Sequence, residues 1–76
     1  MEKNWFDFVN QKCRTESEAH NAIGMRITHA GSEWRVVDHN DLGVIYWQVH
    51  GKDGRPKGKM FCNSELDRKA GLAGAY

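Results

Sequence analysis

Residues 44–50 read Val-Ile-Tyr-Trp-Gln-Val-His, and this run of β-branched and aromatic side chains is the strongest strand signal in the chain. Because side chains alternate between the two faces of a strand, Ile45, Trp47 and Val49 share one face. The opposite face is also partly apolar. The run therefore predicts a central strand that is covered on both sides, or one with a face kept for a partner.

The residues after this strand predict a hairpin. Asp53-Gly54 is typical of a tight primed turn, in which both central residues need positive φ. Residues 59–62 are the expected returning strand. Pro56 has no N–H to donate to a ladder, so the start of that return is predicted to be an edge or a loop.

The residues before the strand predict a second hairpin over 25–37. Apolar and polar residues alternate there, and residues 30–32, Ala-Gly-Ser, are typical of a turn. Trp34 has the same inward phase as Trp47, so we expect both rings in the core on adjacent strands. The polar run 38–43 is the expected loop between this hairpin and the central strand.

The N-terminal part favours helix. Apolar residues recur at spacings of three and four over 4–13, and Thr15 with Glu18 forms a capping-box pattern that begins a further helical stretch over 15–23. Gly24 is the expected stop. Whether these are two helices or one bent helix stays open at this stage.

The C-terminal part predicts one short helix. Ser64 is the expected N-cap with Asp67 at the third helical position, and Gly71 is the expected end. The tail 72–76 is expected to fray. The chain is therefore an α+β domain with an N-terminal helical segment, an antiparallel meander of three to four strands (SH3-like or ββα-like) and a short C-terminal helix.

Length and charge restrict the function. A chain of 76 residues is expected to form a single small domain over 1–76, with little volume for a substrate pocket. Residues 1–50 have five Lys/Arg and seven Asp/Glu, net −2, whereas residues 51–76 have six and three, net +3. No apolar run is long enough for a signal peptide or a membrane span, so we expect a cytoplasmic protein with Cys13 and Cys62 reduced.

Motifs for catalysis or for a cofactor are missing from the sequence. It contains no nucleophile elbow, phosphate loop, dinucleotide fingerprint or Cys-x-x-Cys pair, and no two of its His and Cys residues are closer than seven positions. The cluster His39-Asn40-Asp41 is typical of a polar loop. We therefore expect a protein that is not an enzyme and that has no cofactor and no metal.

Basic residues gather on the predicted hairpin next to the aromatic strand. The candidates for nucleic-acid contact are Lys52, Arg55, Lys57, Lys59 and Tyr46. Cations on a projecting hairpin suit contact with phosphates. The simpler interpretation is that the lysines keep an edge strand soluble and block edge-to-edge pairing.

Two resemblances accompany this hypothesis. The order of strand 46–49, turn 53–54, strand 59–61 and helix from 63 resembles AP2-type and integrase arm-binding domains, which implies a sheet that enters the DNA major groove. Pro56 and the early stop at Gly71 depart from that pattern. The three runs 24–27, 31–34 and 44–49 resemble successive strands of SH3-like barrels, which implies a similar fold and no particular function.

The competing hypothesis is a protein-binding module or inhibitor, of the size common among phage and mobile-element proteins. Its expected footprint is Val37, Tyr46 and Phe61 on the outward face of the sheet, and a homodimer stays open. The near-neutral net charge of +1 favours this hypothesis, whereas the basic hairpin favours a nucleic-acid partner.

Overall fold

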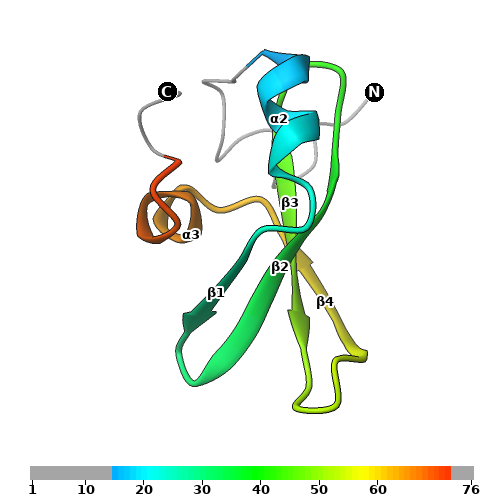
Figure 1. Ribbon diagram of the computed structural model, residues 1–76, viewed down its shortest axis with the longest axis vertical. Coiled ribbons are helices and arrows are strands. Elements are labelled where there is room, and N and C mark those ends of the chain that lie inside the picture. The colour runs from blue at the N-terminus through cyan, green and yellow to red at the C-terminus, as the bar shows by residue number, and fades with distance from the viewer. Residues whose placement is uncertain (1–14, 73–76) are drawn as a thin grey trace, which may run out of the picture.

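The computed structural model describes residues 15–72, which form two short helices and one antiparallel sheet (Figure 1). The elements, in chain order, are α2 (Glu16–Ala22), β1 (Arg26–His29), β2 (Ser32–His39), β3 (Ile45–His50), β4 (Pro56–Phe61) and α3 (Ser64–Lys69). The strands form a meander in the order β1-β2-β3-β4. The predicted α+β fold with a meander of three to four strands is therefore confirmed, and the number of strands is four. The expected helical segment 4–13 lies outside the described residues.

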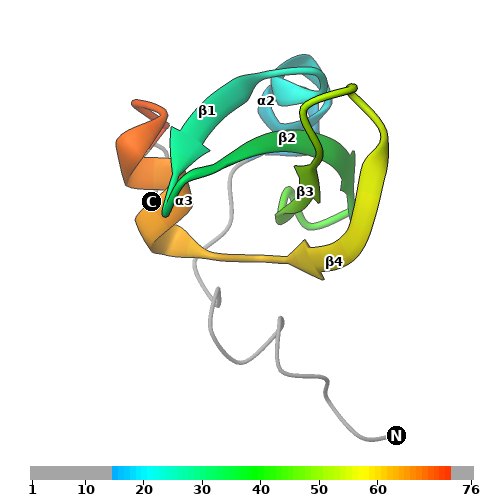
Figure 2. The same cartoon turned by 90° about the horizontal axis from the view of Figure 1, so that it is seen from below.

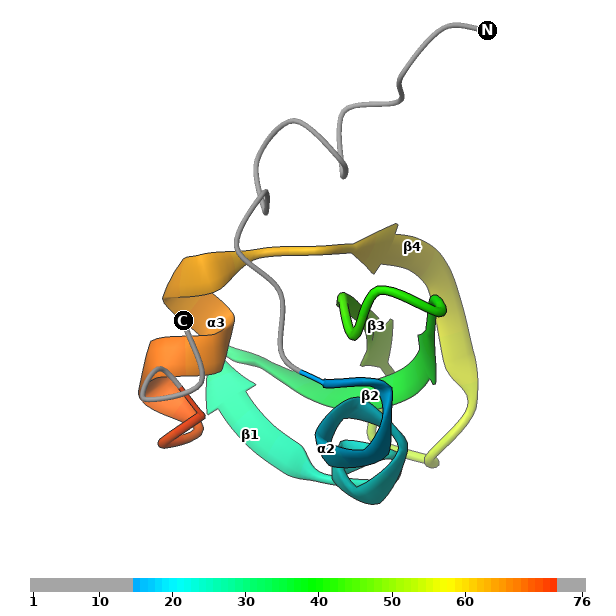
Figure 3. The same ribbon diagram turned by 90° about the horizontal axis from the view of Figure 1, so that it is seen from above.

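The sheet is curled, and α3 lies across its open side. Figures 2 and 3 show the four strands wrapping round, so that α3, which follows β4, comes to lie beside β1 at the opposite edge. α2 packs against β2 near the end of the sheet that is uppermost in Figure 1. The curl gives the sheet an inner face, turned toward the two helices, and an outer face.

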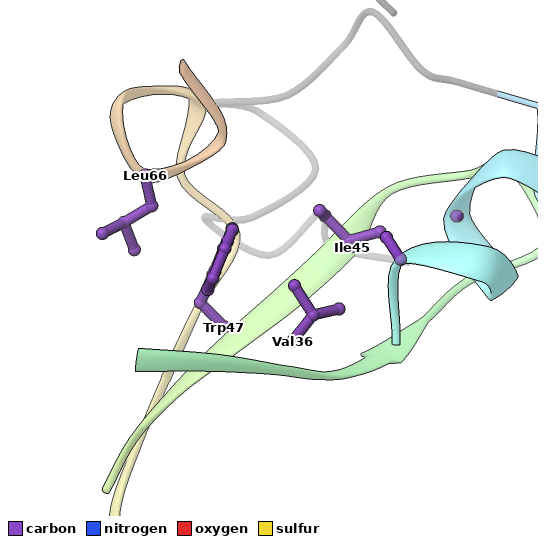
Figure 4. Packing of buried hydrophobic residues seen from close by; sticks show 6 residues of the cluster. Val36, Ile45, Trp47 and Leu66 are labelled. Atoms are coloured by element: carbon purple, nitrogen blue, oxygen red, sulfur yellow. The ribbon is translucent and has the colours of Figure 1, made fainter. Parts of the chain in front are cut away.

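The inner face holds the core. Val36 lies opposite Trp47 in the β2–β3 register, and both side chains are buried, as is Ile45. The remaining buried members of the core are Ala19 and Ala22 of α2 and Leu66 of α3. Figure 4 shows the Trp47 ring standing between Leu66 and the aliphatic side chains of the sheet. The predicted inward phase of the central strand is confirmed.

The prediction that the Trp34 ring lies in the core is confirmed only in part. It lies opposite Val49 on the inner face and packs against the core, but it stays half-buried. Its indole Nε1 donates to the carbonyl oxygen of His29 at 3.1 Å. Trp34 stands toward the β1–β2 turn, two pairs away from the centre of the core, so its ring covers the rim of the core and keeps its N–H on a backbone acceptor.

One buried hydrogen bond joins the sheet to α3. The indole Nε1 of Trp47 donates to Oδ1 of Asp67 at 2.6 Å, and both side chains are fully buried. A carboxylate is costly to bury without donors, so this bond is part of what allows Asp67 to sit in the core. Asp67 was expected at the third helical position after a Ser64 cap; it connects α3 to the central strand.

The start of α3 explains that difference. The N-cap is Asn63 rather than Ser64, because the Asn63 side chain accepts from the backbone N–H of Glu65 at 2.7 Å and of Leu66 at 3.4 Å. Asparagine is at least as good a cap as serine. The helix therefore begins one residue earlier than a Ser64 cap predicts, and Asp67 takes the fourth helical position instead of the third.

The end of α3 follows the predicted stop at Gly71. Gly71 has φ +82°, the N–H of Leu72 donates to the Asp67 carbonyl at 2.8 Å, and the N–H of Gly71 donates to the Arg68 carbonyl at 3.0 Å. These two bonds form a Schellman motif. Leu72 also packs against the core, so it belongs to the folded unit and not to the frayed tail expected for 72–76.

Thr15 caps α2 as predicted. It has extended backbone angles, and its Oγ1 accepts from the N–H of Glu18 at 3.2 Å. Gly24, with φ +94°, follows the last turn. The N-cap is important for stability because α2 has only seven residues, and so short a helix has little intrinsic stability.

We therefore expect Thr15→Ala to destabilise the domain by about 0.5–2 kcal/mol, since the Glu18 N–H loses its acceptor. Chemical denaturation followed by far-ultraviolet circular dichroism measures this loss. Thr15→Ser is the matched control, because serine keeps the hydroxyl and should leave the stability nearly unchanged. Equal losses in the two variants would show that the hydroxyl contributes nothing.

The β1–β2 turn places an alanine in a left-handed conformation. Ala30 has φ +53° and Gly31 has φ +77°, which is the pattern of a two-residue type I′ turn. His29 and Ser32 close this turn as the last pair of the ladder. Alanine pays a steric penalty of about 1–2 kcal/mol in this region, whereas Asn tolerates it far better.

We expect Ala30→Asn to stabilise the domain by about 0.5–1 kcal/mol, because it creates the Asn-Gly pair that this turn type prefers. For a domain of this size that corresponds to a rise of roughly 2–8 °C in Tm. Ala30→Val is the opposite control and should lower Tm, since a β-branched residue fits a positive φ poorly. An unchanged Tm in both variants would contradict the left-handed assignment.

Candidate nucleic-acid interface

The tip of the β3–β4 hairpin is a three-residue loop, Lys52-Asp53-Gly54. The N–H of Gly54 donates to the Gly51 carbonyl at 3.0 Å, and the N–H of Gly51 donates to the Arg55 carbonyl at 2.9 Å. Only Gly54 has positive φ, at +84°, while Asp53 does not. The predicted two-residue primed turn is therefore wrong, and the loop is a β-turn followed by a glycine bulge.

The loop conformation is held by side chains as well as by backbone bonds. Asp53 Oδ1 accepts from the N–H of Arg55 at 3.0 Å, which forms an Asx turn. The prediction of a two-residue turn did not take this bond into account. His50, which is buried, bonds through Nδ1 to the Gly54 carbonyl at 3.1 Å. Since a carbonyl only accepts, His50 Nδ1 is the donor. This hydrogen bond holds the tip of the hairpin against the end of β3.

Four cations project from this hairpin into solvent. Lys52, Arg55, Lys57 and Lys59 are all exposed, as predicted for phosphate contact. Within residues 15–72 the three lysines have no ion pair, and Arg55 has one, to Asp53 at 3.7 Å. That pair is largely exposed on both sides, so it holds the Arg55 charge only weakly.

Two of these lysines lie on an irregular part of β4. The β3–β4 register passes from Gln48 opposite Met60 to His50 opposite Pro56, so residues 57–59 together face a single position of β3. Gly58, at φ +100°, allows this bulge. Pro56 is the first residue of this last strand, as the edge prediction required. The bulge displaces Lys57 and Lys59 from a regular ladder.

Tyr46 is not brought to the basic hairpin. It lies on the outer face opposite Asp38, and its hydroxyl accepts from Asn40 Nδ2 at 3.5 Å. It is four residues before His50 on β3, or roughly 13 Å along the strand at about 3.3 Å per residue. A single surface that includes Tyr46 and the hairpin cations must therefore extend along the whole outer face.

The predicted protein-binding footprint is divided between the two faces. Val37 stands at a β-bulge beside Asp38, and with Tyr46 it belongs to the outer side of the sheet. Phe61 lies opposite Trp47, and its ring centroid is 5.6 Å from that of Trp34. The expectation that Phe61 faces outward is wrong, because Phe61 pairs with the inward-facing Trp47 and its ring packs against that of Trp34.

The outer face carries a row of residues that the sequence analysis did not select. Arg26, Arg35, Gln48 and Met60 lie opposite one another across all four strands. Glu33 stands between the two arginines, 3.1 Å from Arg35 Nη2 and 3.9 Å from Arg26 Nη1. The alternation of residues 25–37 already placed both arginines on the polar side, and this was the available signal.

Arg35 extends this row to the hairpin. Its Nη2 lies 3.6 Å from the position that a Cβ would take on Gly54, so the guanidinium reaches the loop from β2. Its Nε is buried and has no hydrogen-bond partner within the described part of the chain, and the same holds for Nε2 of His50. The base of the hairpin is therefore a polar cluster with unused hydrogen-bonding capacity.

Charge is separated along the long axis of the molecule. The hairpin residues 51–59 carry four basic residues and one acidic residue. The opposite end in Figure 1, which α2 and the β2–β3 connection form, carries Glu16, Glu18, Asp38 and Asp41 and no Lys or Arg over 15–24 and 38–44. Such an arrangement orients a molecule toward a polyanion.

Comparison with known proteins gives no match to a family model, to a curated protein or to a solved structure. Among the described residues, no helix is long and apolar enough to cross a membrane. In the same range, no group of three or more His, Cys, Asp or Glu side chains is placed to hold a metal ion.

Proposed function

We propose that this protein is a small, non-enzymatic binding protein of the cytoplasm that contacts nucleic acid through the basic hairpin of residues 51–59. The observation that carries the proposal is the separation of charge. Three lysines with no ion pair to any residue of 15–72 lie on a hairpin that side-chain hydrogen bonds hold in place, and four carboxylates lie at the other end. Phosphates attract such a tip, and the acidic end is directed away from them.

The local geometry adds to this argument. A loop that is already ordered loses less conformational entropy when it binds, so the bonds from Asp53 and His50 favour affinity. Arg35, which is paired with Glu33, reaches the base of the loop from β2. Exposed edge lysines that served solubility alone would not need a tip held by side chains.

A protein partner is the less favoured alternative. Of the three residues in its predicted footprint, Phe61 lies on the inner face of the sheet. Only Val37 and Tyr46 remain on the outer face. Both remaining side chains are half-buried. The apolar surface that they offer is small compared with the area that a stable protein interface buries, about 800 Å² on each partner.

The test is the salt dependence of binding. Fluorescence anisotropy with a labelled duplex of about 20 base pairs, and with one of its single strands, should show binding at low salt that weakens as salt rises. Four phosphate contacts predict a slope of log K against log salt of about −3.6 for the duplex. Absence of binding to either probe at low salt, or a slope near zero, would rule out the proposal. Poly-glutamate is the control polyanion, and equally tight binding to it would show that phosphate is not what the hairpin recognises.

A further inference from the structure

The fold brings together two histidines that are 19 positions apart in the sequence. The ring centroids of His20 on α2 and His39 at the end of β2 are 5.7 Å apart, and the ring planes are nearly perpendicular at 89°. Sequence spacing gave no hint of this pair, since no two His or Cys residues are closer than seven positions. The pair lies at the acidic end of the molecule, far from the basic hairpin.

The hydrogen bonding of His39 leaves one ring nitrogen available. Its Nδ1 lies 2.9 Å from the carbonyl oxygen of Asn40, which can only accept, so Nδ1 carries the proton. The lone pair of Nε2 is then available in the neutral ring. A bond from one ring nitrogen to a backbone carbonyl is the arrangement that orients histidine ligands at metal sites.

His20 is able to adjust to a shared ligand. Its side chain is exposed, whereas His39 is half-buried. The terminal torsion of a histidine side chain is broad, so turning the ring of His20 costs little. Two imidazoles on one tetrahedral ion have their centroids about 5–6 Å apart, because each ligating nitrogen lies about 2.0–2.1 Å from the metal. The observed separation is within that range.

The surrounding charges favour a cation. Glu16 lies four residues before His20, on the same face of α2. Asp38 and Asp41 lie on either side of the His39 segment, although the Asp38 carboxylate already accepts from the His39 N–H at 2.8 Å. Over 15–24 and 38–44 there is no Lys or Arg to repel a metal ion.

We propose that His20 and His39 bind a divalent transition-metal ion of the zinc, nickel or copper class. Imidazole nitrogen suits these ions, and the borderline ligand set excludes calcium and magnesium, which prefer oxygen. Within 15–72 no group of three His, Cys, Asp or Glu side chains is placed to hold a metal ion, so the proposed site has two protein ligands, and water would fill its other coordination positions. The site goes beyond the proposed nucleic-acid function and does not depend on it.

Calorimetric titration of the full chain with Zn²⁺ tests the site. Saturable binding of one ion is expected, weakened at least tenfold in His20→Ala and in His39→Ala. His29→Ala is the matched control, because His29 is also a half-buried imidazole near a carboxylate, 3.8 Å from Glu65, and it should bind as the unchanged protein does. His20 is exposed, so its replacement leaves the fold intact and keeps the test valid if His39→Ala unfolds.

Imidazole nitrogen spectra give a second readout. Zn²⁺ should shift the Nε2 resonance of His39 and leave its Nδ1 protonated. The proposal is overturned if no saturable binding occurs below about 1 mM, which is about −4.1 kcal/mol. It is equally overturned if His20→Ala binds as tightly as the unchanged protein, or if His29→Ala loses as much affinity as His20→Ala.

Discussion

Trp47→Ala is expected to lower the free energy of unfolding by about 3–5 kcal/mol, a large part of the total. Trp47 is fully buried, and removal of a buried Trp side chain costs about 3–5 kcal/mol. A domain of 76 residues has a total stability of about 4–11 kcal/mol at 0.05–0.15 kcal/mol per residue. The substitution also removes the donor to Asp67, which leaves a buried carboxylate with one bond fewer.

A second variant separates packing from hydrogen bonding. Trp47→Phe keeps much of the ring volume and loses the N–H, so its cost should be about 1–3 kcal/mol, less than that of the alanine variant. Urea denaturation followed by circular dichroism gives both numbers. Met60→Ala, on the exposed outer face, is the control and should change stability by less than about 0.5 kcal/mol. A Trp47→Ala protein that melts like the unchanged one would refute the register of the core.

Loss of nucleic-acid binding is the expected result of the triple change Arg55→Ala, Lys57→Ala and Lys59→Ala. Each cation that no longer neutralises a phosphate reduces the slope of log K against log salt by about 0.9, so the slope should fall by about 2.7. The three side chains are exposed, and their removal should change stability by less than about 0.5 kcal/mol each. Anisotropy titration at several salt concentrations, with Tm measured in parallel, gives both results.

A charge-matched pair of variants tests whether position matters. Arg55→Ala with Lys57→Ala removes two cations from the hairpin, and Arg68→Ala with Lys69→Ala removes two exposed cations from α3. The proposal expects a large loss of affinity in the first variant and a small one in the second. Equal losses in the two would mean that net charge alone decides binding and that the hairpin has no special part.

Periodicity and end signals predicted the fold because they depend on neighbours in the sequence. Alternation over 44–50 placed Ile45 and Trp47 inward, and Gly24 and Gly71 ended their helices where a positive φ is needed. Thr15 was predictable for the same reason, since a cap bonds to an N–H three residues away.

The predictions from the sequence fail in two situations. In the first, a neighbouring residue takes the structural role that was assigned to another. In the second, the contact joins residues that are far apart in the sequence. Asn63 took the cap from Ser64, and the Asx turn of Asp53 gave a three-residue loop in place of a primed turn. Phe61 faces inward because the pairing of β3 with β4 places it opposite Trp47. No local pattern could have paired His20 with His39 or Trp47 with Asp67, because those contacts form only after the sheet has curled.

For the candidate interface, the sequence predicted which cations are exposed, but it did not predict which other residues lie beside them. Lys52, Arg55, Lys57 and Lys59 are exposed as expected, whereas Tyr46 stands at the far end of its strand. The position of Arg35 beside Gly54 depends on the pairing of β2 with β3 and on a side chain that reaches across it. That combination is a property of the folded sheet.

The bond between Trp47 and Asp67 has a consequence for synthesis on the ribosome. The central strand finds its last core neighbours, Leu66 and Asp67, in the final helix of the described chain. A nascent chain that has emerged only as far as β4 exposes the Trp47 ring and leaves its N–H without this acceptor. The core cannot close without α3, so stable folding is expected only after α3 has been synthesised and has left the exit tunnel.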